Sequence, residues 1–143
     1  MQTVHDILKK KGSEICSVSP DTSVYDALKL MAEKNIGAVL VMQAGRPVGI
    51  LSERDYARQV ILKGKASKDT PVREIMTARV IFVRPEQSVE DCMALMTDKH
   101  IRHLPVLEGE TLLGILSIGD VVKAVISEKQ FRIEQLENYI TNG

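Results

Sequence analysis

Apolar residues follow two different spacings along this chain, and the alternation between them predicts the order of helices and strands. Between residues 24 and 31 they recur at steps of three and four, as on one face of a helix. A continuous apolar run at 38–42 and a second run ending at Ser52 flank a turn that contains Gly45, which is typical of two adjacent strands. With a short strand before the first helix and another helix after Ser52, the predicted order is strand, helix, strand, strand, helix.

The same order occurs twice. Residues 18–62 align with residues 83–127 without a gap at a constant offset of 65 residues, and 17 of the 45 aligned pairs are identical. The segment Gly-Ile-Leu-Ser-x-x-Asp at 49–55 returns at 114–120. Two copies of a unit too small to bury its own apolar face can bury that face against each other. The sequence therefore predicts a duplicated fold of mixed α/β (α+β) class.

Polar residues mark where the elements begin. Ser23 and Ser88 precede the first helix of each repeat, and Asp26 and Asp91 follow three residues later, the pattern of an N-cap with a favourable charge in the first turn. A short helical lead-in is predicted at 4–8 and another at 72–76. The expected organisation is a first repeat with its lead-in helix at 1–62, a polar linker at 63–71, a second repeat at 72–127 and a helical extension at 128–143.

The extension carries its own pattern. Ile126, Ile133 and Ile140 recur every seven residues, with Leu136 between the last two. This spacing is compatible with a helix that contacts a second copy of the chain and with a helix that packs on the chain's own surface.

Composition removes several classes of function. Nineteen Lys and Arg residues balance 19 Asp and Glu residues, so the chain lacks the overall positive charge that favours nucleic acid or anionic membranes. Cys16 and Cys92 occupy non-equivalent positions of the two repeats, which favours free thiols in a reducing compartment. The first residues show no targeting signal. We expect a cytoplasmic protein that binds neither nucleic acid nor membrane.

Together these features resemble a tandem pair of cystathionine-beta-synthase (CBS) domains. The resemblance rests on the lead-in helix, the strand, proline and helix that open each repeat, the Arg-His-Leu-Pro-Val run at 102–106, and the closing Gly-x-x-Ser-x-x-Asp. It extends from Val4 to about Ile126 and is strongest to small bacterial proteins that consist of one such pair. It implies two pseudo-twofold-related repeats with two clefts, adenosine-containing ligands such as AMP, ADP, ATP, NAD(H) or S-adenosylmethionine, and a homodimer.

Within this resemblance, Asp55 and Asp120 are the candidate ribose ligands, because one carboxylate can accept hydrogen bonds from two vicinal hydroxyls. Ser52 and Ser117 lie at helix starts, where hydroxyl and backbone N–H groups can meet phosphate or ribose oxygens. The same residues are also explained as N-cap serines and first-turn aspartates, and the two roles can coexist.

The adenine slot that the resemblance implies consists of the first strand and the strand after the first helix. Most of its candidate residues would serve equally as ordinary core. They are Val18, Ser19, Ile36, Gly37 and Ala38 in one repeat and Val83, Arg84, Ile101, Leu104 and Pro105 in the other.

Positive charge distinguishes the repeats. Arg54 precedes Asp55 in the first repeat, whereas Arg102 and His103 occupy the positions of Gly37 and Ala38 in the second. Guanidinium groups bind phosphate in a bidentate manner, so Arg54, Arg102, His103 and Arg84 are the phosphate candidates, with exposed surface residues as the alternative. The two sites should therefore differ in ligand or in occupancy.

No catalytic or metal motif is recognisable. Cys92, His100 and His103 do not share one helical face, and the sequence contains no Walker loop and no GxGxxG segment. We therefore expect a non-enzymatic regulatory module that senses an adenine nucleotide through the conformation of a homodimer, with NAD(H) or AMP favoured and ATP or ADP as further candidates. The alternatives are a constitutive homodimeric scaffold with vestigial clefts and, third, an enzyme.

Overall fold

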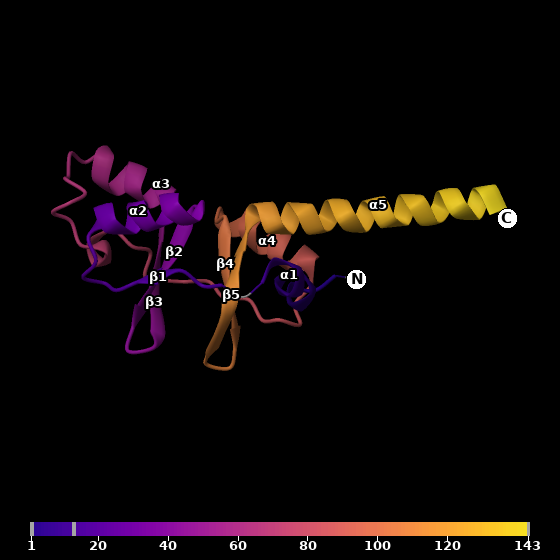
Figure 1. Cartoon of the computed structure of the whole chain (residues 1–143), viewed down its shortest axis with the longest axis horizontal. Helices are drawn as coiled ribbons and strands as arrows, with labels where there is room; N and C mark the ends of the chain where they lie inside the picture. The colour runs from indigo at the N-terminus through magenta and orange to yellow at the C-terminus, as the bar shows by residue number, and fades with distance from the viewer. Residues whose placement is uncertain (1, 13, 143) are drawn as a thin grey trace. The chain divides into compact units, whose positions relative to one another are not determined.

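A computed structural model describes residues 2–12 and 14–142; Met1 and Ser13, in the expected first domain, and Gly143, in the expected extension, lie outside the described residues. The chain divides into two compact units. The first-repeat unit comprises Ile15–Val80, and the second-repeat unit comprises Met1–Glu14 together with Ile81–Gly143. The first repeat shows the predicted strand, helix, strand, strand, helix order, and the second repeat shows the same order except that its first strand is a single bridge residue (Figure 1).

The first-repeat unit is a three-stranded sheet covered by helix. Strand β1 is parallel to β2, and β2 is antiparallel to β3. The core of this unit joins one face of α2 to the sheet, with Val24, Met31, Val39 and Leu51 buried. The elements are β1 (Ser17–Val18), α2 (Val24–Lys34), β2 (Ala38–Gln43), β3 (Arg46–Ser52), α3 (Glu53–Tyr56), a π-helical stretch η1 (Ala57–Ile61) and a 3-10 turn η2 (Val72–Glu74).

The second-repeat unit is built on the β4–β5 hairpin. Its core includes Val89 and Met96 from α4, Leu104 from β4 and Val121 from α5. The elements are α1 (Val4–Lys11), α4 (Val89–Lys99), β4 (His103–Glu108), β5 (Thr111–Ser117) and α5 (Ile118–Asn142).

The first strand of the second repeat is reduced to one residue. Val83 alone pairs in parallel with Val106. In the first repeat, the Leu40 N–H donates to the Cys16 carbonyl at 3.3 Å, which extends the β1–β2 pairing. The residue at the corresponding position of the second repeat is Pro105, which has no N–H to donate. The proline therefore shortens this strand.

The lead-in segments are exchanged between the repeats. Helix α1 packs on the second repeat, where the Val4 N–H donates to the Gln87 carbonyl and the His5 N–H to the Pro85 carbonyl, each at 2.9 Å. The segment at η2 makes the equivalent contact with the first repeat, where the Val72 N–H donates to the Thr22 carbonyl at 2.8 Å. Burial of Val4 and Val72 drives each exchange. Packing thus groups residues 1–14 with the second repeat, not with the repeat that follows them in sequence.

The predicted helix starts are confirmed. Ser23 Oγ accepts the Asp26 N–H, and Ser88 Oγ accepts the Asp91 N–H, each at 3.1 Å. Both helices end in a left-handed residue, Asn35 in α2 and His100 in α4, each at φ 53°. His100 thus has the same C-cap role in α4 as Asn35 has in α2.

Gly49 and Gly114 hold equivalent positions against the lead-in segments. A Cβ on Gly49 would lie 2.5 Å from Met76 Sδ, and one on Gly114 would lie 2.8 Å from Leu8 Cδ2. The close packing of each lead-in on its strand explains why both positions are glycine.

Helix α5 continues without a break through the expected boundary at residue 128. Its second half runs beyond α1 and α4 of the same unit (Figure 1). Ile133, Leu136 and Ile140 are exposed by 48%, 62% and 78%. None of the helices in the described part of the chain is both long and apolar enough to span a membrane.

Candidate functional site

The Ser-x-x-Asp segment forms the same corner in both repeats, where a strand meets a helix. In the first repeat, the Ser52 N–H and hydroxyl both donate to Asp55 Oδ2 at 3.0 Å, and the Asp55 N–H donates back to Ser52 Oγ at 3.2 Å. In the second, the Ser117 N–H donates to Asp120 Oδ2 at 2.8 Å, and the Asp120 N–H donates to Ser117 Oγ at 3.2 Å. We call these the Ser52–Asp55 corner and the Ser117–Asp120 corner. Each is a capping box that stabilises its helix.

Backbone contacts place the start of β2 beside the Ser52–Asp55 corner and the start of β4 beside the Ser117–Asp120 corner. Ala38 is the register partner of Ser52, and the Glu53 N–H donates to the Gly37 carbonyl at 3.1 Å. In the second repeat, His103 is the register partner of Ser117, and the Ile118 N–H donates to the Arg102 carbonyl at 2.8 Å.

These contacts gather the predicted site residues at the two corners. Ile36, Gly37, Ala38, Ser52, Arg54 and Asp55 cluster in the first-repeat unit, and Ile101, Arg102, His103, Ser117 and Asp120 cluster in the second-repeat unit.

The predicted residues of the first strand lie farther away. Val18 is opposite Val41, three positions along β2 from Ala38, which corresponds to roughly 10 Å at the usual strand rise. Ser19 lies beyond it, where its N–H donates to Thr22 Oγ1 at 3.1 Å. Because β1 runs parallel to β2, Cys16 is nearer to the corner than Val18 is. Strand direction, which the sequence did not reveal, decides this order.

The same displacement applies in the second repeat. Val83 pairs with Val106, three positions from His103. Arg84 follows Val83, and its N–H donates to Gln87 Oε1 at 2.8 Å while its exposed guanidinium lies 3.6 Å from Glu86 Oε1. Arg84 therefore makes local contacts in a turn.

Several of the apolar candidates are buried in the unit cores. Val83 and Leu104 are fully buried and belong to the core of the second-repeat unit. Ala38 and Pro105 are also buried, whereas Ile36 and Ile101 are half-buried. Among these apolar candidates, the half-buried side chains of Ile36 and Ile101 can contact a ligand at the corners. The buried candidates can contribute only their backbone groups.

Lys11 is a residue of the Ser117–Asp120 corner that the sequence did not single out. From the last turn of α1, its Nζ donates to Asp120 Oδ2 and to the Ile115 carbonyl, each at 2.6 Å. Lys11 follows the buried Ile7 by four residues, so helical periodicity places both on one face. The four-residue spacing from Ile7 is visible in the sequence, but it points to Asp120 only once α1 is known to pack on the second repeat.

The charges around this corner shift two pKa values. Burial alone would raise the pKa of Asp120, but the hydrogen bonds from Lys11 and from the Ser117 N–H outweigh it and hold that pKa below its ordinary value. Burial, and then the positive charge of Lys11, lower the pKa of His103, against a smaller opposing effect of Asp120. His103 therefore favours its neutral form.

Arg54 and Arg102 are both exposed, each close in sequence or by backbone contact to its corner. The second corner thus combines Arg102, His103 and Lys11, whereas Arg54 is the predicted cation of the first. Within residues 2–12 and 14–142, no three His, Cys, Asp or Glu side chains are placed to hold a metal ion.

Comparisons with known proteins agree with the geometry. The family model of the CBS domain matches residues 4–61 and 72–127. CBS domain-containing protein CBSX3, mitochondrial, from Arabidopsis thaliana is 41% identical over 150 residues, covering 99% of this chain and 73% of that protein. CBS domain-containing protein YhcV from Bacillus subtilis (strain 168) is 33% identical over 121 residues, covering 85% of this chain and 84% of that protein.

A solved structure extends the comparison to the fold. A CBS-domain protein from Burkholderia ambifaria MC40-6, provisionally named a signal-transduction protein, is 54% identical, with a TM-score of 0.86 over 88% of this chain and 95% of that chain. The duplicated corners, the exchanged lead-ins and these matches lead to one conclusion: the chain belongs to the CBS-domain family and carries two CBS domains in tandem.

Proposed function

We propose that this CBS pair is a non-catalytic regulatory module that binds an adenine nucleotide at its Ser-Asp corners. The observation that supports this proposal is which oxygen of each aspartate carboxylate accepts the hydrogen bonds of the corner. In the described part of the chain, every hydrogen bond that the side-chain carboxylates of Asp55 and Asp120 accept is to Oδ2. Oδ1 of each carboxylate is left to accept hydrogen bonds from the vicinal hydroxyls of a ribose. The capping role therefore holds the carboxylate in place and is compatible with ligand binding.

The residues around the corners suit a nucleoside monophosphate or dinucleotide. Ile36 and Ile101 offer half-buried apolar surface for a base, and the corner backbone offers polar groups beside it. Arg54 and Arg102 supply guanidinium groups for phosphate. NAD(H) or AMP are the favoured ligands, with ATP or ADP as further candidates.

The two corners differ in what a ligand has to displace. At the Ser117–Asp120 corner, Lys11 already neutralises the carboxylate. At the Ser52–Asp55 corner, the carboxylate partners found among the described residues are the N–H and hydroxyl of Ser52. A ribose can approach Asp55 without breaking an ion pair, so the first-repeat corner should bind the nucleotide more tightly.

Regulation would act through a homodimer. Ile126, Ile133, Leu136 and Ile140 form an exposed apolar stripe along α5, and burial of such a stripe against a second copy would be favourable. Nucleotide binding produces an output only if it stabilises one dimer conformation more than another.

The stripe is tested by sedimentation of the full chain. Replacement of Ile133 and Leu136 by lysine should convert a dimer to a monomer, because it places charge in the contact. Replacement of Gln135 and Asn138 by lysine adds the same charge on other faces of the helix and should leave the dimer intact. Equal sedimentation of both variants and the wild type would refute the role of the stripe.

Nucleotide binding is tested first by mass spectrometry of small molecules that copurify with the protein, which needs no preselected panel. Thermal unfolding follows with AMP, ATP, NAD(H) and S-adenosylmethionine. A ligand at about 100 times its dissociation constant should stabilise the fold by about 2.7 kcal/mol.

Asp55→Asn should weaken binding more than Asp120→Asn does, and Asp98→Asn on the exposed face of α4 is the matched control. The absence of any copurifying ligand and of any stabilisation would refute the proposal.

That outcome would favour the second candidate, a constitutive homodimeric scaffold with vestigial sites. The observation that supports it is that both aspartates already have structural roles as helix caps.

We also propose a reducing, cytoplasmic location, because neither Cys16 nor Cys92 is in a disulfide. Turnover of a nucleotide under the binding conditions would contradict the non-catalytic assignment.

A further inference from the structure

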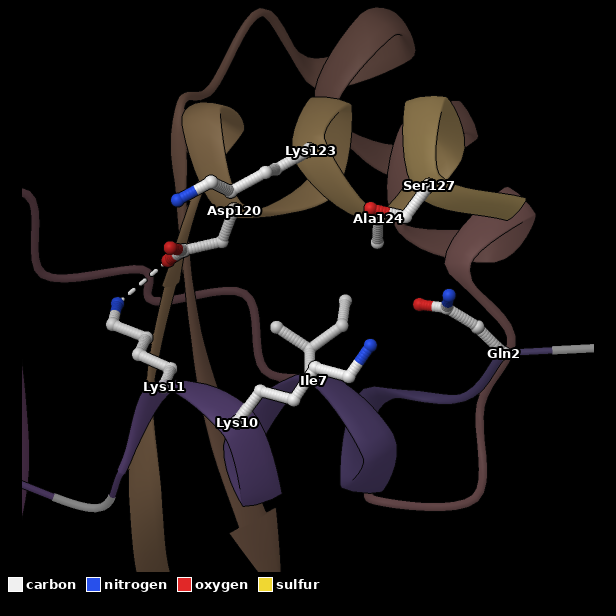
Figure 2. Close-up of a pocket in the computed structure, with 8 residues that line it drawn as sticks. All are labelled: Gln2, Ile7, Lys10, Lys11, Asp120, Lys123, Ala124 and Ser127. Carbon is white, nitrogen blue, oxygen red and sulfur yellow. Dashed lines mark hydrogen bonds and ion pairs between the residues drawn. The ribbon is translucent and has the colours of Figure 1, made fainter. Parts of the chain in front are cut away.

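A pocket of about 360 Å³ lies between α1 and the first turns of α5, wholly within the second-repeat unit (Figure 2). Lys10 and Lys11 line it from α1, and Asp120 and Lys123 line it from α5. Ile7 from α1 and Ala124 from α5 point toward each other and give the pocket apolar surface (Figure 2). Of the residues predicted from the sequence to bind a ligand, Asp120 alone belongs to this lining, so the pocket extends beyond the proposed nucleotide corner.

The charges around the pocket do not balance. The single carboxylate, Asp120, is paired with Lys11 at 2.6 Å. Lys10 and Lys123 have no carboxylate partner among residues 2–12 and 14–142, so two positive charges remain at the pocket. Gln2 and Ser127 add an amide and a hydroxyl that can donate hydrogen bonds. The lining therefore combines hydrogen-bond donors with excess positive charge, with the Lys123 ammonium at the Asp120 end of the pocket and the Lys10 ammonium beside Ile7 (Figure 2).

Lysines at the end of a helix have an ordinary explanation, because positive charge there stabilises the helix dipole. That explanation covers Lys9, Lys10 and Lys11 equally. It does not account for Lys123, which lines the same pocket from the second turn of α5, far from the C-terminal end of that helix.

We infer that this pocket binds a small phosphate-bearing anion through Lys10 and Lys123, with Lys11 as a third cation. Ammonium groups are compact charges that bind phosphate oxygens. The phosphate can belong to a separate small molecule or to a nucleotide held at Asp120. The site itself does not depend on the nucleotide proposal.

The test is titration calorimetry of the full-length chain with inorganic pyrophosphate. Lys10→Gln combined with Lys123→Gln should weaken binding at least about tenfold, since two ammonium contacts are lost. The matched control combines Lys9→Gln with Lys129→Gln, on the same two helices and with the same change in charge. Both control residues are exposed and lie outside the lining, so this variant should stay within about twofold of the wild type. Failure of the wild type to bind pyrophosphate, or equal weakening in both double variants, would overturn the inference.

A second arm identifies the source of the phosphate. If AMP competes with pyrophosphate, and the Lys10 and Lys123 variant weakens AMP but not adenosine, then the pocket receives the nucleotide's phosphate. If AMP and pyrophosphate bind together, the pocket serves a separate molecule. Both results support the phosphate site. Adenosine binding, which needs no phosphate, tests the proposed ribose corners separately through Asp55→Asn and Asp120→Asn.

Discussion

Lys11 and Asp120 are 109 residues apart in the sequence, and Lys11 Nζ lies 2.6 Å from Asp120 Oδ2. This ion pair joins the exchanged lead-in helix α1 to the corner that closes the second repeat. It also makes the second corner electrostatically unlike the first, although the Ser-x-x-Asp segment is the same in both.

Lys11→Met should destabilise the protein by no more than about 1 kcal/mol at neutral pH, because both side chains are partly exposed and solvent screens the pair. The folded-state pKa of Asp120 is lowered, so its contribution to stability is present above the unfolded pKa and is lost as pH falls through the folded value. The difference in unfolding free energy between wild type and variant should therefore shrink in acid. Urea unfolding across that range measures it, with Lys9→Met as the control, and a difference independent of pH would contradict the assignment.

Gly49→Ala and Gly114→Ala should each cost about 1–3 kcal/mol, because the added methyl group overlaps the lead-in segment. Gly49→Ala should cost more, since its Cβ also meets the Thr77 carbonyl oxygen at 3.1 Å and backbone yields less than a side chain. Leu8→Ala should partly rescue Gly114→Ala, because the overlap is with Leu8 Cδ2. A double-mutant cycle by chemical denaturation measures this coupling, and strictly additive effects would show that the two residues do not interact.

His103 should make the protein less stable as pH falls below about 6.5. Its folded-state pKa is lowered by burial and by Lys11, so the unfolded chain binds the proton first, and stability is lost between the unfolded and folded pKa values. His103→Gln should flatten that part of the profile. Unfolding free energies at about pH 7.5 and about pH 5.5 test this, with the exposed His5→Gln as the control. An unchanged profile in His103→Gln would exclude His103 as the cause.

Cys92 should resist alkylation in the native state. Burial, followed by the nearby charge of Asp91, raises the pKa of its thiol to about 11, so little thiolate exists at neutral pH. Cys16 is half-buried and should react first with iodoacetamide. Mass spectrometry of peptides from native and urea-unfolded protein measures the order, and equal labelling in the native state would contradict the buried position of Cys92.

Much of the local structure could be predicted from the sequence. Ser23 and Ser88 cap the predicted helices, and the three- and four-residue spacing from Val24 identified a buried helical face. These features depend on neighbours in the chain, which is why the sequence reveals them. Ile36–Ala38 could be grouped with Ser52 and Asp55 because the duplication and the family resemblance supplied the register.

The amino-acid sequence is enough to identify a duplicated unit with the same Ser-x-x-Asp segment at the corner of each copy, because helical period, strand runs and capping residues are local properties. Tertiary packing establishes which lead-in packs on which repeat, that Gly49 and Gly114 accommodate those lead-ins, and that Lys11 pairs with Asp120. It also decided that strand direction carries Val18 and Val83 away from the corners. Those outcomes depend on burial and pairing between segments far apart in the chain, which a local pattern does not encode.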